Sequence, residues 1–172
     1  MQKYAFTDRD GTIIEELGRD EKEVAFPPKN IEEVRFLEGA IGGMQQLIAN
    51  NYKLVLATNQ AYLDTERNPH DVYDKVMDYF YGELLKAGIK FDYVMVCPHG
   101  LEENCNCRKP KVGGLDEFFQ KHQDNIDLEN SLMFGDRESD RLFADNLKVR
   151  FVKVETNGNF IIPKELVSSN KP

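Results

Sequence analysis

The segment Asp8-Arg9-Asp10-Gly11-Thr12 holds two carboxylates one residue apart, directly after the apolar run Tyr4–Phe6. If this run is an extended strand, its side chains alternate, so Asp8 and Asp10 share one side and Arg9 points away. Two adjacent carboxylates repel each other, which favours a shared proton or a bound divalent cation. Such a pair suits phosphoryl transfer, in which one carboxylate attacks phosphorus, the other moves protons, and a metal neutralises charge.

Other polar groups stand where further elements of the chain end or begin. They are Thr58-Asn59-Gln60, Arg108-Lys109, Asp136 and Asp140. The Thr58 hydroxyl and the amides after it could hold phosphate oxygens, Lys109 could supply a fixed cation, and Asp136 could bind a metal. Asp140 could bind that metal or support it. The alternative is two helix caps and a surface lysine, but parallel strands place their carboxyl ends on one edge, so we expect these groups to converge.

All three cysteines of the chain lie within eleven residues, next to a histidine. Cys97, His99, Cys105 and Cys107 supply three thiolates and one imidazole, which is a tetrahedral zinc set with no position left open. The alternative is a chance grouping of free thiols. We predict a structural zinc ion that orders the loop leading to Arg108 and Lys109.

Short apolar runs alternate with helical stripes along the chain. The predicted strands are Tyr4–Phe6, Leu54–Ala57, Tyr93–Val96, Ser131–Phe134 and Val149–Val154. The helical stripes are Ile41–Ile48, Val72–Leu84 (opened by Asn68-Pro69 and closed by Gly88), Leu115–His122 and Leu142–Leu147. This order predicts an α/β fold with a central parallel sheet and helices on both faces. We expect residues 15–36 to form a flap, residues from Gly158 onward to form a peripheral tail, and residues 1–172 to form a single domain.

Composition limits the classes of function. The chain has 172 residues and a net charge of −8, with 41% hydrophobic and 30% charged residues. These values are ordinary for a globular protein, and the negative charge argues against nucleic acid as a partner. No apolar stretch is long enough to cross a membrane, and the first residues lack a signal-peptide layout. We therefore expect a cytoplasmic protein that acts on a small phosphate ester.

Three other polar residues have competing interpretations. His122 lies on an apolar helical face and is interpreted as a packing residue. Glu15 and Glu16 follow the first motif and are interpreted as a solvated acidic run. The alternative is that these two acids meet a cationic part of a substrate.

Together the motifs resemble those of the haloacid-dehalogenase-like phosphatases, and the resemblance covers nearly the whole chain. Asp8-x-Asp10-Gly11-Thr12, Thr58-Asn59-Gln60, Arg108-Lys109-Pro110-Lys111 and Gly135-Asp136-x-x-x-Asp140 occur in the family's order. The zinc loop is similar to that of the branch containing histidinol-phosphate and heptose-bisphosphate phosphatases. Gly135–Asp140, Ala144–Leu147 and Glu155-Thr156-x-Gly158-Asn159 look closer to histidinol-phosphate phosphatases.

The resemblance implies a Rossmann-like fold with a minimal cap made of the flap and the zinc loop. It implies that Asp8 is the nucleophile and Asp10 the acid and base. Mg²⁺ would be held by the Asp8 carboxylate, the Asp10 backbone carbonyl and Asp136. Thr58, the Asn59 amide and Lys109 would hold the phosphoryl oxygens, and Arg108 would orient the substrate.

The implied reaction is the hydrolysis of L-histidinol phosphate in histidine biosynthesis. The alternatives are heptose 1,7-bisphosphate or another small sugar phosphate as substrate, and a non-enzymatic binding module built on the zinc loop.

Overall fold

The apolar runs predicted as strands form one parallel sheet in the computed structural model, which describes residues 1–122 and 125–167. The strands are β1 (Lys3–Thr7), β2 (Tyr52–Asn59), β3 (Phe91–Cys97), β4 (Leu132–Gly135) and β5 (Arg150–Lys153). Their order is β3-β2-β1-β4-β5, and each neighbouring pair is parallel. The α/β fold with a central parallel sheet is therefore confirmed, with β1 in the middle.

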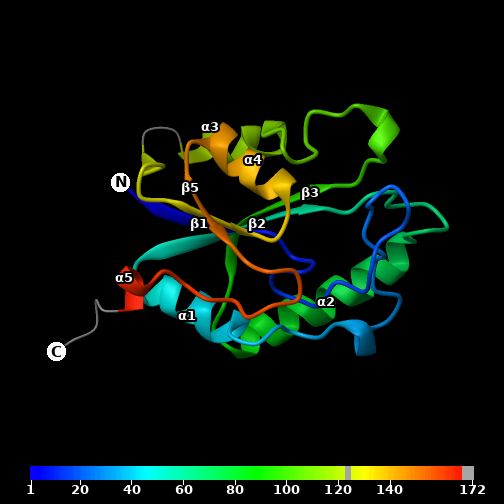
Figure 1. Cartoon of the computed structure of the whole chain (residues 1–172), viewed down its shortest axis with the longest axis horizontal. Helices are drawn as coiled ribbons and strands as arrows, with labels where there is room; N and C mark the ends of the chain where they lie inside the picture. Colours follow the sequence, from blue (N-terminus) through cyan, green and yellow to red (C-terminus); the bar gives the residue numbers. More distant parts are fainter. Residues whose placement is uncertain (123–124, 168–172) are drawn as a thin grey trace.

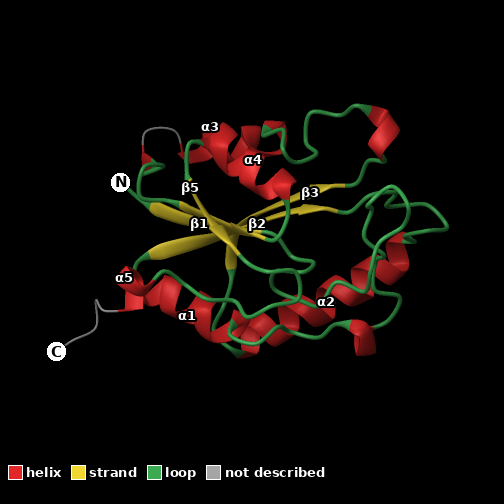
Figure 2. Cartoon of the chain, viewed as in Figure 1, coloured by secondary structure: helices red, strands yellow, loops and turns green. Residues whose placement is uncertain are grey.

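Helices cover both faces of this sheet, as Figures 1 and 2 show. They are α1 (Ala40–Ala49), α2 (His70–Lys86), α3 (Asp116–His122), α4 (Glu138–Leu147) and the short α5 (Lys164–Val167). Three 3-10 turns lie at Ile31–Glu33, Leu101–Glu103 and Gly113–Leu115. In Figure 1, α1 and α2 lie below the strands and α3 and α4 above them. Within the described ranges, no helix is both long and apolar enough to span a bilayer.

The central strand shows why the sheet needs two helical layers. Side chains alternate along β1, so Ala5 joins the apolar cluster beneath α1 and α2. Tyr4 and Phe6 point to the opposite face and join the cluster beneath α3 and α4. All three residues are buried, which is the pattern of a strand covered on both faces. This packing positions the end of β1, where Asp8 follows.

Most element boundaries differ from the predictions by one to three residues, and two differences bear on the packing around the site. The sequence predicts Asn68 as the cap of helix α2 and Pro69 as its first residue, but the helix begins at His70 with Pro69 as its N-cap, because Pro69 has extended rather than helical dihedral angles. The prediction of a peripheral tail after Gly158 is wrong in part, since Phe160 and Ile162 are buried in the core. A Cβ atom at Gly43 of α1 would lie 2.6 Å from the Phe160 ring, so this glycine lets the segment pack against the helix.

Residues 15–36 form a flap, as predicted, although they contain no regular strand. An antiparallel bridge between Arg19 and Ala25 closes its tip, and a second bridge joins Ile14 to Phe36 at its base. Arg67 reaches the tip from outside and pairs with Asp20 at 2.6 Å. The flap is thus held at both ends beside the edge of the sheet where the motifs converge.

Candidate active site

The predicted polar groups meet at the carboxyl edge of the sheet. Asp8 directly follows β1, Thr58 and Asn59 end β2, and Asp136 directly follows β4. The Asp8 amide donates to the Phe134 carbonyl at 2.9 Å, which fixes the end of β1 beside β4. Parallel strand order therefore explains how groups more than a hundred residues apart come together.

Lys109 is the cation at the centre of this cluster. Its Nζ atom lies 2.7 Å from Asp8 Oδ1 and 2.6 Å from Asp140 Oδ1, and its side chain is only 2% exposed. The Asn59 side chain holds the Lys109 backbone, since Asn59 Oδ1 accepts from the Lys109 amide at 3.0 Å. A buried lysine between two carboxylates is suited to binding the oxygens of a phosphoryl group.

Burial changes the proton affinity of the proposed nucleophile. It raises the pKa of Asp8 from its usual 3.8 to about 7, against the opposing effect of Lys109. Nearby Asp140 and Asp136 raise the pKa of Asp8 further. Because a carboxylate attacks phosphorus only when it is ionised, Lys109 and any bound cation keep Asp8 in its reactive form.

Asp10 is held by a buried network that the sequence did not reveal. The Arg9 guanidinium donates to both Asp10 oxygens, with Nη2 2.9 Å from Oδ1 and 3.0 Å from Oδ2. Gln60 Nε2 donates to Asp10 Oδ2 and to Thr58 Oγ1, both at 2.8 Å. The prediction that Arg9 points away is wrong, because β1 ends at Thr7 and strand alternation does not extend to Arg9.

Asp136 has one oxygen available for a cation. Its Oδ2 accepts from Thr156 Oγ1 at 2.7 Å, whereas its Oδ1 is buried and has no hydrogen-bond partner among the described residues. Burial raises the pKa of Asp136, and the Thr156 hydroxyl opposes that effect. Asp8, Asp136 and Asp140 offer oxygens that all lie within 4.8 Å of one another. Such a set of oxygens fits Mg²⁺.

Asp140 has a different environment from Asp136. Its Oδ1 pairs with Lys109, and its Oδ2 accepts from the Arg137 amide at 3.0 Å at the start of α4. Oδ1 forms an ion pair with Lys109 at 2.6 Å without hydrogen-bond geometry, whereas the ion pair of Asp136 with Arg19 is made through Oδ2. This geometry favours a role in holding Lys109 over direct ligation of a metal.

The base of the flap adds a second charged cluster. The buried Glu16 carboxylate pairs with Arg19 at 2.5 Å and also pairs with Arg137. The interpretation of Glu16 as a solvated residue is therefore wrong, and its charge is already matched by two arginines. Only Glu15, which pairs with Arg35 at 3.3 Å, fits that interpretation. The pair between Glu16 and Arg137 holds the base of the flap beside the carboxyl edge of the sheet.

A narrow pocket lies between the flap and the strand ends. Its walls combine the proposed catalytic residues with Arg108, Arg137 and the flap residues Val24–Pro27. Arg108 itself contacts the zinc loop through the His99 carbonyl, 3.4 Å from Nη1. The walls of the pocket therefore combine acidic groups with two arginines.

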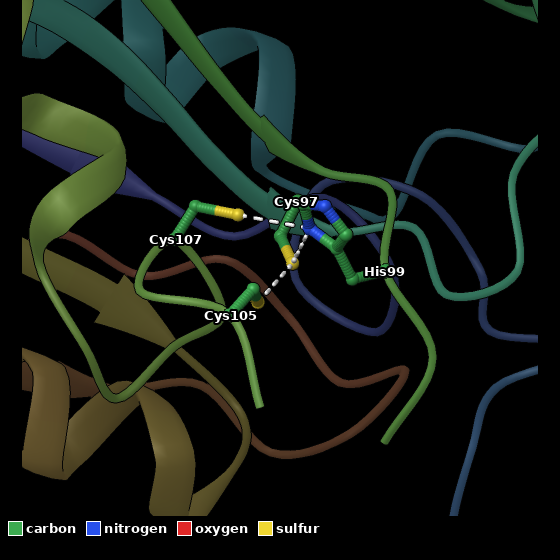
Figure 3. A group of neighbouring side chains, drawn as sticks. All are labelled: Cys97, His99, Cys105 and Cys107. Carbon is green, nitrogen blue, oxygen red and sulfur yellow. Dashed lines mark hydrogen bonds between the residues drawn. The ribbon is translucent and has the colours of Figure 1, made fainter. Parts of the chain in front are cut away.

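The cysteines and His99 form a cluster beside this pocket, and Figure 3 shows their side chains pointing toward one another. Cys97 Sγ lies 3.6 Å from Cys105 Sγ and 3.7 Å from His99 Nδ1, and His99 Nδ1 lies 3.2 Å from Cys107 Sγ. Ligands about 2.3 Å from a tetrahedral zinc ion are roughly 3.8 Å apart. Burial raises the pKa of Cys97 to about 12, so a cation would be needed to hold its thiolate. The donor set therefore fits Zn²⁺.

We expect about one zinc ion per chain by elemental analysis of protein purified without chelator. His99→Asn should lose most of the zinc and melt about 5 °C or more below the wild type, because the loop would lose the ion that orders it. His70→Asn is the matched control, since His70 is 54% exposed and lies outside the cluster. Zinc-free protein that melts and turns over like the wild type would contradict the assignment.

His122 has the packing role expected from the sequence. Its ring lies 4.8 Å from the Phe118 ring, and its Nδ1 lies 3.2 Å from the Tyr4 hydroxyl. Its Nε2 lies 3.4 Å from Asp92, which is on β3 and not among the residues of the candidate site. His122 therefore takes no part in the candidate site.

Sequence reasoning missed several residues that shape the site, namely Arg9, Gln60, Arg19, Arg137, Thr156 and Asn157. Arg9 and Gln60 stand inside motifs that were recognised, but their contacts depend on turns that begin where strands end. Thr156 and Asn157 stand in a segment that resembled the family without an assigned role. Arg19 offered no signal, because its contact with Asp136 depends on how the flap folds back over the end of β4.

Comparison with known proteins gives a consistent set of similarities. The family model described as polynucleotide kinase 3 phosphatase matches residues 3–157. The histidine biosynthesis bifunctional protein HisB of Campylobacter jejuni subsp. doylei is 38% identical over 98% of the chain and 46% of its own length. The protein of the same name from Buchnera aphidicola subsp. Acyrthosiphon pisum is 34% identical over 88% of the chain and 40% of its length. The chain thus spans less than half the length of these curated relatives.

A solved structure shares the fold across nearly the whole chain. It is the D,D-heptose 1,7-bisphosphate phosphatase of B. bronchiseptica, in complex with magnesium and phosphate. The TM-score is 0.74 and the sequence identity is 26%, with 99% of this chain and 89% of that chain covered. That structure contains magnesium, which is also the ion that fits the three carboxylates of this site.

Proposed function

We propose that this chain, which belongs to the haloacid-dehalogenase-like phosphatases, hydrolyses L-histidinol phosphate to L-histidinol and phosphate with Mg²⁺ as cofactor. The observation that carries the proposed chemistry is the position of Asp8, whose carboxylate lies 2.7 Å from the buried Lys109 ammonium at the carboxyl edge of the sheet. A carboxylate beside a fixed cation and next to further metal-binding carboxylates is suited to attack on a phosphate dianion.

In this proposal, Asp8 attacks phosphorus in line and the phosphorus–oxygen bond to the alcohol breaks. Asp10 donates a proton to the leaving alkoxide, and an aspartyl-phosphate remains on Asp8. Asp10 then takes a proton from the water that hydrolyses this intermediate. Arg9 and Gln60 hold the Asp10 carboxylate in place for both steps.

The phosphoryl oxygens would be held by Lys109, the Thr58 hydroxyl and the Asn59 amide. Because Thr58 Oγ1 accepts a hydrogen bond from Gln60, its own proton can be directed to the phosphate. Mg²⁺, held by the Asp8 carboxylate, the Asp10 carbonyl and Asp136, would offset the repulsion between the nucleophile and the substrate. The buried Asp136 Oδ1 supports this ligand set.

The choice of substrate rests on the relatives. The bifunctional histidine-biosynthesis proteins match 98% of the chain at 38% identity, a higher identity than the 26% of the heptose-bisphosphate phosphatase structure. We therefore propose a role in histidine biosynthesis in the cytoplasm, with residues 1–172 as one phosphatase domain. Arg108, which lines the pocket, would orient the part of the substrate beyond the phosphate.

A second candidate is a heptose 1,7-bisphosphate phosphatase. The observation in its favour is the likeness in fold to that enzyme over 99% of the chain. The matched family model also brings polynucleotide 3′-phosphates into consideration. The net charge of −8 argues against a nucleic acid, which would need a basic surface.

Three substrates separate these possibilities in one assay with Mg²⁺. We expect kcat/KM for L-histidinol phosphate to exceed those for heptose 1,7-bisphosphate and a 3′-phosphorylated oligonucleotide by about tenfold or more, because a matched pocket favours one leaving group in the transition state. The Asp8→Asn variant, prepared in parallel, controls for contaminating phosphatases. A higher kcat/KM for either competing substrate would contradict the proposed substrate.

A further inference from the structure

The loop that follows β5 touches both the proposed magnesium site and the base of the flap. Thr156 Oγ1 donates to Asp136 Oδ2 at 2.7 Å. The next residue, Asn157, forms two hydrogen bonds with the Glu16 backbone, accepting from its amide at 2.7 Å and donating to its carbonyl at 3.0 Å. The backbone amide of Asn157 also donates to the Gly11 carbonyl at 3.1 Å. Two adjacent residues therefore reach two separate parts of the pocket.

These contacts close into a ring. Glu16, held by Asn157, pairs with Arg19, and Arg19 Nη2 returns to Asp136 Oδ2 at 3.4 Å. Thr156 and Arg19 thus approach the same oxygen of Asp136, whose side chain is fully buried. With Oδ2 restrained in this way, the carboxylate is turned so that Oδ1 remains for a cation.

The backbone around the ring leaves little room for other arrangements. A Cβ atom at Gly11 would lie 2.7 Å from Asp136 Oδ2, so the chain approaches this carboxylate as closely as a glycine allows. Asn157 has a φ of 58°, a left-handed conformation that asparagine and glycine adopt more readily than other residues. Its side chain can therefore face Glu16 while its own amide reaches Gly11.

We propose that Thr156 and Asn157 are positioning residues, with Thr156 turning Asp136 toward the metal and Asn157 holding the base of the flap over the pocket. This rests on the proposed function, because it takes Asp136 as a magnesium ligand. Neither residue touches the reacting atoms. Thr156 acts on metal affinity through Asp136, and Asn157 acts on substrate retention through Glu16.

Direct titration with Mg²⁺, in the absence of substrate, tests the role of Thr156. Thr156→Val removes the donor at nearly constant volume and is expected to raise the Mg²⁺ dissociation constant about tenfold. Thr156→Ser keeps the hydroxyl and should bind Mg²⁺ within about twofold of the wild type. Equal affinity of Thr156→Val and the wild type would overturn this role. So would an equal loss in Thr156→Ser.

Hydrogen exchange tests the role of Asn157. Asn157→Gly keeps the positive φ and removes both side-chain bonds, so the peptide containing the Glu16 amide should exchange faster than in the wild type. The variant should also show a several-fold higher KM for histidinol phosphate, with its Mg²⁺ dissociation constant unchanged within about twofold. Wild-type exchange in this peptide would overturn the role of Asn157.

The same titration separates failure of this inference from failure of the proposed function. If the wild type does not bind Mg²⁺, both the proposed cofactor and the proposed role of Thr156 are wrong. If the wild type binds Mg²⁺ and Thr156→Val binds it equally, only the role of Thr156 falls. Melting temperatures measured in chelator show whether either variant has lost its fold, and Thr156→Ser then decides the outcome.

Discussion

Asp8→Asn is expected to abolish turnover of every phosphomonoester, with kcat reduced by about 10⁴-fold or more. The amide has nearly the shape of the carboxylate but cannot attack phosphorus or carry the phosphoryl group. The fold should persist, because burial already disfavours the ionised Asp8 carboxyl and raises its pKa to about 7. Replacing it with a neutral amide therefore removes a charge that is costly to bury. Steady-state phosphate release and the melting temperature of the metal-free protein measure both effects.

The matched control for this variant is Asp145→Asn. Asp145 is 56% exposed on α4 and pairs only with Arg141 among the described residues, at 2.7 Å. This control should retain wild-type kcat and KM. Substantial activity in Asp8→Asn, with the control also active, would exclude Asp8 as the nucleophile.

Lys109→Met is expected to lower kcat by about 10³-fold. The variant keeps the length of the side chain but leaves Asp8 and Asp140 facing each other without a cation, and it removes a ligand for the phosphoryl oxygens. Because Lys109 opposes the rise in the pKa of Asp8, its loss should raise that pKa further. In the pH–rate profile, the fall in activity toward low pH should therefore begin at a higher pH than in the wild type.

The same variant gives a prediction for stability. A carboxyl whose pKa is raised by folding destabilises the folded state as the pH rises above its ordinary value, because it ionises more easily in the unfolded chain. Metal-free Lys109→Met should lose about 3 kcal/mol or more of stability at pH 8, where the two carboxylates are left without their cation, and should lose less at pH 5, where Asp8 is protonated. Lys75→Met, at a side chain that is 74% exposed, is the control. An unchanged kcat, or an equal loss at both pH values, would argue against this role of Lys109.

Much of the fold could be predicted from the sequence, because the features that specify it are local. Each strand is a short apolar run, and each long helix has an apolar stripe. The alternation of the two along the chain predicts a parallel sheet covered by helices. The convergence of Asp8, Thr58 and Asp136 also followed, since strand ends of a parallel sheet share an edge. The proximity of Cys97, His99, Cys105 and Cys107 followed from their spacing alone.

The parts that could not be predicted depend on long-range contacts of loops. Strand alternation suggested that Arg9 points away from Asp10, but the strand ends two residues earlier and the following turn reverses this side chain. Phe160 stands in an irregular segment with no periodicity, yet its ring stacks on Phe134 at 4.8 Å. The contacts of Thr156 and Asn157 with the site likewise depend on where the loop after β5 returns.

The most direct test of Asp8 as the nucleophile is to trap the enzyme during turnover of L-histidinol phosphate with Mg²⁺. Acid quenching followed by borohydride reduction converts an aspartyl-phosphate to homoserine, which peptide mass spectrometry can locate. We expect this conversion at Asp8, and we expect it to depend on Mg²⁺ and on the substrate. Conversion at another aspartate, or continued turnover of histidinol phosphate with no modified peptide during steady state or in a single turnover, would contradict it.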